Sequence, residues 1–84
     1  MILQTEHPYV VFDPIACEGR PSIKGTTIAV DFVVRLSRVA RPAEILASLP
    51  EDYLRPAALY SALSYYYDHL EEIDEIISEN KRLR

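Results

Sequence analysis

Glycine occurs at only two positions of this 84-residue chain, Gly19 and Gly25. Because glycine reaches positive φ without a Cβ clash, two glycines six residues apart predict two backbone turns. Pro21 and the β-branched residues of the segment Gly19–Val30 favour extended backbone between and after those turns. The segment is therefore predicted to run turn, strand, turn, strand. No glycine follows Asp31, and from there apolar residues recur at helical spacing.

Another short strand is predicted before the glycines. Tyr9–Phe12 is an aromatic and β-branched run, and Asp13 and Pro14 end it in a turn. The chain length suits one domain, residues 1–84, with a small core. We predict an α+β, mainly α fold. A short N-terminal β-hairpin over residues 1–30 precedes a helix-turn-helix-like unit of three to four helices over 31–67, and an acidic C-terminal helix covers 68–84.

The first two predicted helices follow Asp31, which is placed as the N-cap of the first one. Arg35 and Arg38 fall opposite the apolar side of that helix. The second helix runs from about Ala43 to Ser48 or Leu49 and ends before Pro50. The apolar residues assigned to the first helix are Phe32, Val33, Leu36 and Val39 or Ala40, and those buried by the second are Ile45 and Leu46.

The longest predicted helical stretch carries apolar residues at intervals of three and four. Pro56 suits its first turn, and Asp68 and Glu71 have the spacing of a capping box. The stretch is therefore one long helix or two helices joined near Asp68. The apolar stripe consists of Leu59, Leu63, Tyr66, Leu70, Ile73 and Ile77.

Charge is separated along the chain, although the net charge is only −4. Between Arg20 and Arg41 there are five positive residues and one acid, whereas Asp68–Glu79 contains six acids and no Lys or Arg. The first segment suits phosphate and the second suits a basic protein. The single cysteine, Cys17, excludes an intramolecular disulfide, and no signal segment or long apolar run is present, so we expect a cytoplasmic protein.

The positive residues are candidates for nucleic-acid binding through phosphate, and an ordinary solvated face is the alternative. Two short helices and a longer one resemble a helix-turn-helix domain. Its presumed recognition helix offers Arg55, Tyr60, Ser61 and Ser64 but no Lys or Arg from Pro56 to Asn80, which disfavours base readout. The candidate phosphate contacts are Arg20, Lys24, Arg35, Arg38 and Arg41.

The acidic C-terminal segment is the strongest candidate for binding another protein. Its apolar side either packs back on the domain or docks in a partner, in a hetero-oligomer or a homodimer with heptad-like spacing. If this side docks in a partner, replacing Ile73 with Asp should abolish the complex and leave the isolated fold largely intact. The candidate partner-binding residues are Tyr66, Leu70, Glu71, Glu72, Ile73, Glu75 and Ile77.

Catalytic and metal chemistry have little support in the sequence. Cys17, His7 and His69 are far apart and lack metal-ligand spacing, so we expect no catalytic residue, metal or cofactor. Asp13, Glu18 and Asp31 could gather around a metal, but a turn residue at 13 and a helix cap at 31 need fewer assumptions. The run Tyr65–Tyr67 cannot form one stacking platform on a helix, so one or two of its rings are assigned to the core and the rest to an interface.

Three stretches together resemble the family called domain of unknown function 433. They are Gly19–Val30, then Ala43–Leu46 with Pro50, and Ala62–Asp74. Thr27 stands where the family commonly has arginine, and the connection Pro50–Leu54 is about two residues longer than usual. The resemblance implies a β-hairpin with a helix-turn-helix-like unit. It also implies the antitoxin half of a type II, VapBC-like toxin–antitoxin pair, whose partner is a PIN-like ribonuclease encoded by a neighbouring gene.

Two functions follow as expectations. The first is a non-enzymatic antitoxin that neutralises the ribonuclease through its C-terminal helix and can also bind operator DNA. The alternative is a stand-alone DNA-binding transcriptional regulator that holds phosphate through its basic residues.

Overall fold

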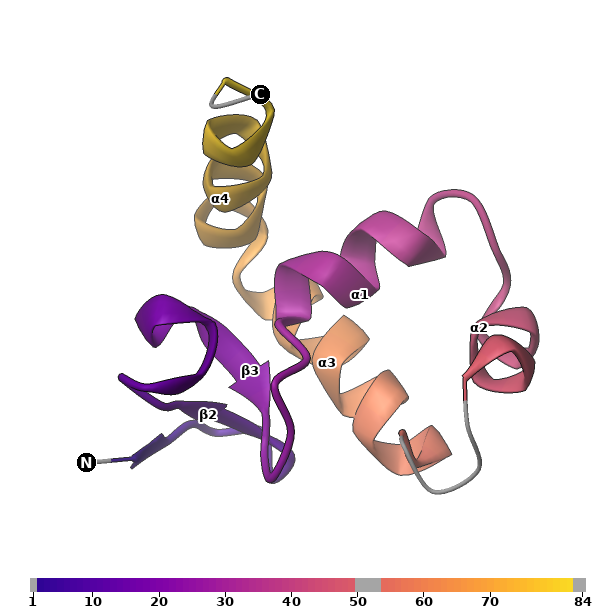
Figure 1. The fold of residues 1–84 in the computed structure, drawn as a ribbon, viewed down its shortest axis with the longest axis horizontal. Coiled ribbons are helices and arrows are strands. Elements are labelled where there is room, and N and C mark those ends of the chain that lie inside the picture. The colour runs from indigo at the N-terminus through magenta and orange to yellow at the C-terminus, as the bar shows by residue number, and fades with distance from the viewer. Residues whose placement is uncertain (1, 50–53, 83–84) are drawn as a thin grey trace.

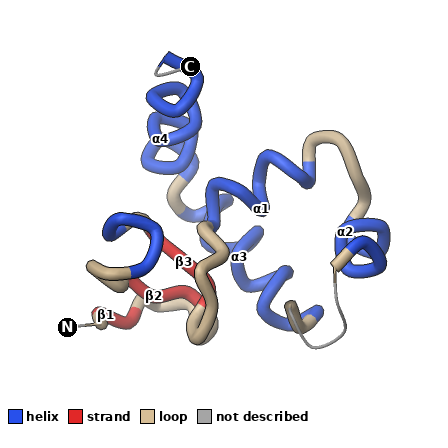
Figure 2. Tube along the Cα trace, viewed as in Figure 1, coloured by secondary structure: helices blue, strands red, loops and turns tan. Residues whose placement is uncertain are grey.

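The computed structural model describes residues 2–49 and 54–82, without the side chains of 80–82. A small antiparallel sheet formed by β1 (Leu3–Gln4), β2 (Val10–Phe12) and β3 (Pro21–Ile23) lies beside the helices (Figures 1 and 2). The helices are α1 (Val30–Ser37), α2 (Pro42–Ser48), α3 (Pro56–Asp68) and α4 (Leu70–Arg82). The predicted α+β, mainly α class is confirmed.

The sheet contains the predicted hairpin and one strand more. β2 lies in the middle, with Val11 opposite Ser22 of β3 and Gln4 opposite Val11 on the other side. The additional strand, β1, is only two residues long and both are exposed. Its sequence carries neither a β-branched run nor a turn signal strong enough to reveal it.

Both glycines adopt the positive φ that their positions suggested. Gly19 has φ of +80° and Gly25 has φ of +78°. Cys17 and Glu18 also have positive φ, 53° and 55°, so three consecutive residues are left-handed within the 3₁₀ turn Ala16–Gly19. Left-handed backbone costs about 1–2 kcal/mol for a residue with a Cβ. The chain after Pro14 is therefore a tight turn and does not continue the β2 strand.

The prediction of a second strand, placed after Gly25, is wrong. Only an isolated bridge joins Ser22 to Ala29, and α1 begins at Val30. Its N-cap is Ala29 and not Asp31, which lies in the first helical turn. Asp31 is 2% exposed and accepts a hydrogen bond from Arg20, so the aspartate is used for a tertiary contact instead of a cap.

The buried side of α1 differs from the predicted one. Val30, Val33 and Val34 face the core at the spacing of one helix face. Phe32 is 48% exposed, so assigning it to the apolar side was wrong. Of the alternatives Val39 or Ala40, the structure selects Ala40, which packs against the core, while Val39 is 83% exposed. The cause is the early start of the helix at Val30, which makes valines 30, 33 and 34 the inward row.

The second helix agrees with its prediction. Pro42 stands at its start, the backbone amide of Arg41 donates to the Glu44 carboxylate at 3.0 Å, and Ile45 is buried. A proline in the first turn loses no helical hydrogen bond. The predicted Pro50 break and the polar connection after it lie outside the described residues.

The long C-terminal stretch is two helices. His69, with φ of −135° and ψ of 46°, separates α3 from α4. Helix α4 contacts α1 and extends away from the sheet (Figure 1). Asp68 ends α3 and its side chain bonds to His7, so it does not cap α4. None of the helices in the described ranges has the length and hydrophobicity needed to span a bilayer.

The core lies between the sheet, α1 and α3, and α4 closes one end of it. Leu59, Ala62 and Tyr65 of α3 are almost fully buried, and so are Ile73 and Ile77 of α4. Burying an aliphatic side chain of this size contributes about 1.5–3 kcal/mol. The apolar stripe of the C-terminal helices therefore belongs largely to the core of this chain.

Candidate functional site

The predicted apolar partner contact of α4 is made inside the chain. Ile73 is fully buried and Ile77 is 3% exposed, both in the main core. Tyr66 is partly buried and its hydroxyl donates to Asp74 at 2.8 Å. These three predicted partner-binding residues thus contribute to the packing of the domain, and Ile73 and Ile77 offer almost no surface to a partner. Of the apolar members of the predicted set, Leu70 is exposed, at 44%.

The acids of α4 divide into two kinds. Glu72 accepts a hydrogen bond from the Tyr65 hydroxyl at 2.7 Å, and Asp74 forms an ion pair with Arg38 at 3.2 Å. Glu71, Glu75 and Glu79 are exposed and bind no other described residue. The first kind faces the flanks of the helix, where neighbouring elements reach it, and the second forms a row pointing outward.

That outward row costs stability. Glu71, Glu75 and Glu79 are four residues apart and so neighbours on the helix surface. Like charges at this spacing destabilise a helix by about 0.2–0.5 kcal/mol per pair. The positive end of the helix dipole favours Glu71 in the first turn but not Glu79. A polar outer face is normal for a helix with one buried side, but packing within the fold does not require an acid at all three positions.

Two apolar side chains at the junction of α3 and α4, just before this row begins, are also exposed. Tyr67, near the end of α3, is 71% exposed, and Leu70, the first residue of α4, is 44% exposed. Tyr65 is 1% exposed, so the tyrosine run supplies one core ring and one surface ring, as predicted. We call Tyr67, Leu70, Glu71, Glu75 and Glu79 the acidic ridge.

The base of the acidic ridge is held by two histidine–carboxylate contacts. His7 Nε2 lies 2.8 Å from an Asp68 carboxylate oxygen, and His69 Nε2 lies 3.1 Å from one of Glu6. Tyr65 lies between them, stacked on His69 at a centroid distance of 4.0 Å and edge-on to His7 at 5.6 Å. The N-terminal segment thus fastens the junction of α3 and α4.

Two groups in this cluster have shifted pKa values. A backbone hydrogen bond at Glu6, followed by the His69 contact, lowers the pKa of the Glu6 carboxyl below its ordinary value of 4.5. Burial, and then the bond to Glu72, raises the pKa of the Tyr65 hydroxyl. Tyr65 is therefore a hydrogen-bond donor over the physiological pH range and not a proton-transfer group.

Sequence reasoning missed this cluster. Glu6, His7 and Asp68 bring potential metal-ligand atoms within 4.8 Å of one another, which the separation of the histidines did not suggest. Their hydrogen bonds and ring contacts give each of them a structural role. The available signal was a repeated dipeptide, an acid followed by histidine, at Glu6-His7 and Asp68-His69.

The predicted phosphate-binding residues do not form one surface set. Arg20 donates to the buried Asp31 at 2.8 Å, and Arg38 pairs with Asp74. Arg35 is partly buried on α1, and Arg41 is exposed at the start of α2. Two of the five charges are thus compensated by acids. Asp13 is a turn residue, as expected, because its carboxylate accepts the Ile15 amide at 2.9 Å.

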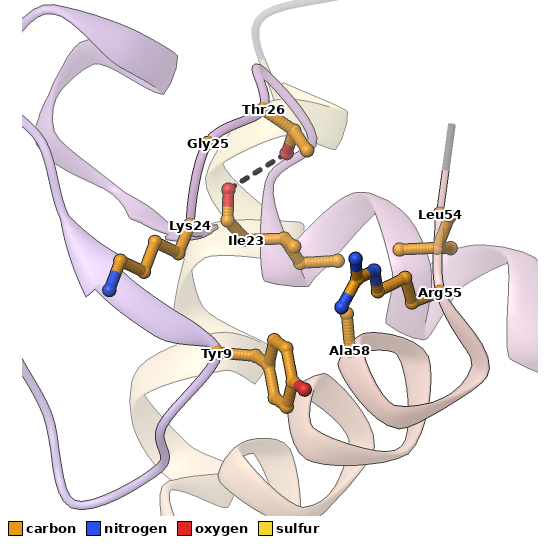
Figure 3. A pocket seen from close by; sticks show the side chains of 8 residues that line it. All are labelled: Tyr9, Ile23, Lys24, Gly25, Thr26, Leu54, Arg55 and Ala58. Carbon is orange, nitrogen blue, oxygen red and sulfur yellow. Dashed lines mark hydrogen bonds between the residues drawn. The ribbon is translucent and has the colours of Figure 1, made fainter. Parts of the chain in front are cut away.

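The remaining cation of the set, Lys24, lines a pocket with a residue outside the set, Arg55. The pocket lies between the turn after β3 and the start of α3 (Figure 3). Neither side chain pairs with an acid among the described residues. The structure brings together two positive residues 31 positions apart, which no spacing rule reveals. The other residues that line the pocket are Tyr9, Ile23, Gly25, Thr26, Leu54 and Ala58.

Cys17 has a structural role. Its thiol donates to the Thr27 carbonyl at 3.1 Å, and burial raises the pKa of the Cys17 thiol despite the opposing effect of Arg20. A thiol with a raised pKa is a poor nucleophile at neutral pH. Glu18 is exposed in the left-handed turn.

Over residues 2–49 and 54–82 the structure is a small α+β fold of one three-stranded sheet and four α-helices, with a charged helical surface at one end. Its sequence matches the model of the family described as "Protein of unknown function (DUF433)" over residues 10–66, so the chain belongs to this family. The match ends in α3, and α4 lies beyond it. Neither curated proteins nor solved structures gave a match.

Proposed function

We propose that this protein is a cytoplasmic antitoxin of a type II, VapBC-like pair and that it binds and neutralises a PIN-like ribonuclease through the acidic ridge. The observation that carries the proposal is the outward row of Glu71, Glu75 and Glu79. Each is exposed and without a partner among the described residues, while the flanking acids of the same helix are bound within the chain.

The chemistry of a ribonuclease suits such a row. An enzyme that binds RNA needs positive groups that hold a chain of phosphates. Three carboxylates spaced one helical turn apart, roughly 6 Å, present a comparable line of negative charge. The acidic ridge can therefore occupy a positive surface in competition with RNA, and charge complementarity would speed the encounter.

Affinity also needs an apolar anchor. Exposed tyrosine combines a large contact area with a polar tip and is enriched among residues that dominate binding energy. Tyr67 and Leu70 are exposed at the junction of α3 and α4, where the row begins, and can provide this area. The proposed contact thus keeps Leu70, Glu71 and Glu75 from the sequence prediction, adds Tyr67 and Glu79, and leaves Ile73 and Ile77 to the core.

Protein binding is favoured over the alternative of a stand-alone DNA-binding regulator. Arg20 and Arg38, two of the five candidate phosphate contacts, are paired with Asp31 and Asp74. Helix α3 has no Lys or Arg along its length. Base readout usually requires such side chains or amides at the groove.

The test is co-purification of the tagged protein with the product of its neighbouring gene, followed by association kinetics at several salt concentrations. The variant E71Q/E75Q/E79Q keeps the shape of the ridge and removes its charge. We expect its association rate to fall about tenfold, with a weaker salt dependence. A single-charge comparison of E75Q with E18Q controls for net charge, because Glu18 is exposed but lies away from α4.

Two results contradict the proposal. One is the absence of any complex with the neighbouring gene product at low salt. The other is a complex whose association rate is the same for the wild type, E75Q, E18Q and the triple variant, since the acidic ridge would then not meet the partner.

A further inference from the structure

We infer that the pocket between the Lys24–Thr26 turn and the start of α3 binds a nucleotide, with its phosphate at Arg55 and its base against Tyr9 and the apolar floor. The pocket has a volume of about 380 Å³. It lies within the range of about 300–1,000 Å³ that small-molecule sites occupy. The inference is independent of the antitoxin proposal, since the pocket and the acidic ridge share no residue.

The floor of the pocket is apolar and firmly packed. Ile23 is 2% exposed, Leu54 7% and Ala58 3%, and all three belong to the main core. They come from the end of β3, the segment before α3 and its first turn. A flat apolar group placed here would be desolvated against a surface that does not need to rearrange.

The walls supply the polar groups. Figure 3 shows the Arg55 guanidinium next to Ala58 and the Tyr9 ring to one side of them, while the Lys24 side chain extends away from these three residues. No hydrogen bond or ion pair occupies the side chain of Arg55, Lys24 or the Tyr9 hydroxyl among the described residues. In contrast, the nearby Thr26 hydroxyl is already bonded to the Ile23 carbonyl at 2.8 Å.

This combination fits a nucleotide better than an inorganic anion alone. A guanidinium binds phosphate through parallel hydrogen bonds. An aromatic ring beside an apolar floor suits a base, which stacks on aromatic side chains in a sequence-tolerant way. The nucleotide can be free or can belong to a nucleic-acid strand, because both present the same base and phosphate.

The experiment is a titration of the full chain with each of several ligands in turn, and binding is measured by NMR and by calorimetry. They are AMP and UMP, adenosine, inorganic phosphate, a single-stranded oligonucleotide and a DNA duplex. We expect the mononucleotides to bind more tightly than adenosine or phosphate and to shift the signals of the pocket residues. If the mononucleotides bind and the strands do not, the ligand is a free nucleotide. If a strand also binds and competes with the mononucleotides, the pocket accepts a nucleotide of a strand.

Variants separate the pocket from general electrostatics. R55Q removes the guanidinium from an exposed side chain and should weaken nucleotide binding about tenfold or more. R35Q is the matched control, since it removes the same charge from α1 outside the pocket. Y9L keeps apolar bulk but removes the ring, and a loss of roughly fivefold or more is expected.

The inference fails if none of the nucleotides or strands shifts the pocket signals at millimolar concentration. It also fails if R55Q and R35Q weaken binding equally, because the affinity would then come from net charge. A third contrary result is unchanged affinity in both R55Q and Y9L.

Discussion

The basic segment Arg20–Arg41 and the acidic segment Asp68–Glu79 look like equivalent opposites in the sequence, but the fold uses their charges differently. In the basic segment Arg20 is bound to a nearly buried aspartate and Arg38 to an acid of α4. Lys24, Arg35 and Arg41 have no acid partner among the described residues, but they come from the turn after β3, from α1 and from the start of α2, and so do not form one row. In the acidic segment the flanking acids are bound within the chain, and Glu71, Glu75 and Glu79 face outward without a described partner. The difference is therefore one of arrangement, because the unpaired acids share one helix face whereas the unpaired cations lie on separate elements.

The largest expected effect is a loss of stability when the buried side of the acidic segment is altered. Ile73 is fully buried, so Ile73→Ala should lower the free energy of unfolding by about 2–5 kcal/mol, and Ile73→Asp by more. Urea denaturation followed by circular dichroism measures this. Leu70→Ala is the control and should change stability by about 1 kcal/mol or less, because Leu70 is substantially exposed.

This expectation replaces the earlier one that Ile73→Asp spares the isolated fold. A folded, stable Ile73→Asp protein would show that the inner side of α4 is not part of the core.

The next effect tests how the basic segment uses Arg20. Removing its guanidinium takes a charge-assisted hydrogen bond from Asp31, so Arg20→Ala should cost about 1.5–3 kcal/mol of stability. Lys24→Ala removes an exposed charge from the same hairpin and should cost no more than about 0.5 kcal/mol. Equal losses in the two variants would mean that Arg20 acts only through net charge.

A smaller effect measures the direct link between the two segments. The Arg38 and Asp74 side chains are 46% and 51% exposed, so their coupling should be about 0.2–1 kcal/mol. A double-mutant cycle with Arg38→Ala and Asp74→Ala, repeated at high salt, gives this value. Coupling that does not decrease with salt would contradict an exposed ion pair.

The smallest effect concerns acid. The backbone bond at Glu6 and then His69 lower the pKa of the Glu6 carboxyl, so Glu6 contributes stability above its ordinary pKa of 4.5. That contribution is lost as the pH falls through the lowered folded-state value. Denaturation between pH 3 and pH 7 should show a shallower acid loss for Glu6→Gln than for the wild type. Glu18→Gln should follow the wild type, and a shared curve for all three would refute this role.

Local signals predicted a large part of the fold. The strand at Tyr9–Phe12, the α2 helix after Pro42 and the positive φ of Gly19 and Gly25 all depend on a few adjacent residues. The start of α1 was missed because the β-branched run ending at Val30 favours a strand locally, while packing against α3 favours a helix. Tertiary contact outweighed propensity there.

The candidate sites depended on distant contacts and were harder to predict. The Glu6–His69 and His7–Asp68 contacts join residues 63 and 61 positions apart. Lys24 and Arg55 line the same pocket although they are far apart in the sequence, and no local pattern predicts this. The acids of α4 were recognised as a group, but only the packing of Tyr65 and Arg38 decided which of them remain outward.

The left-handed run Cys17–Gly19 changes what counts as a conservative replacement at its first two positions. Elsewhere glycine loosens a chain, but here it would relieve a backbone that residues with a Cβ resist. Asparagine is also tolerated in this conformation, whereas valine and isoleucine are strongly disfavoured. Sequence variation at 17 and 18 is thus filtered by the sign of φ, independently of the size or polarity of the side chain.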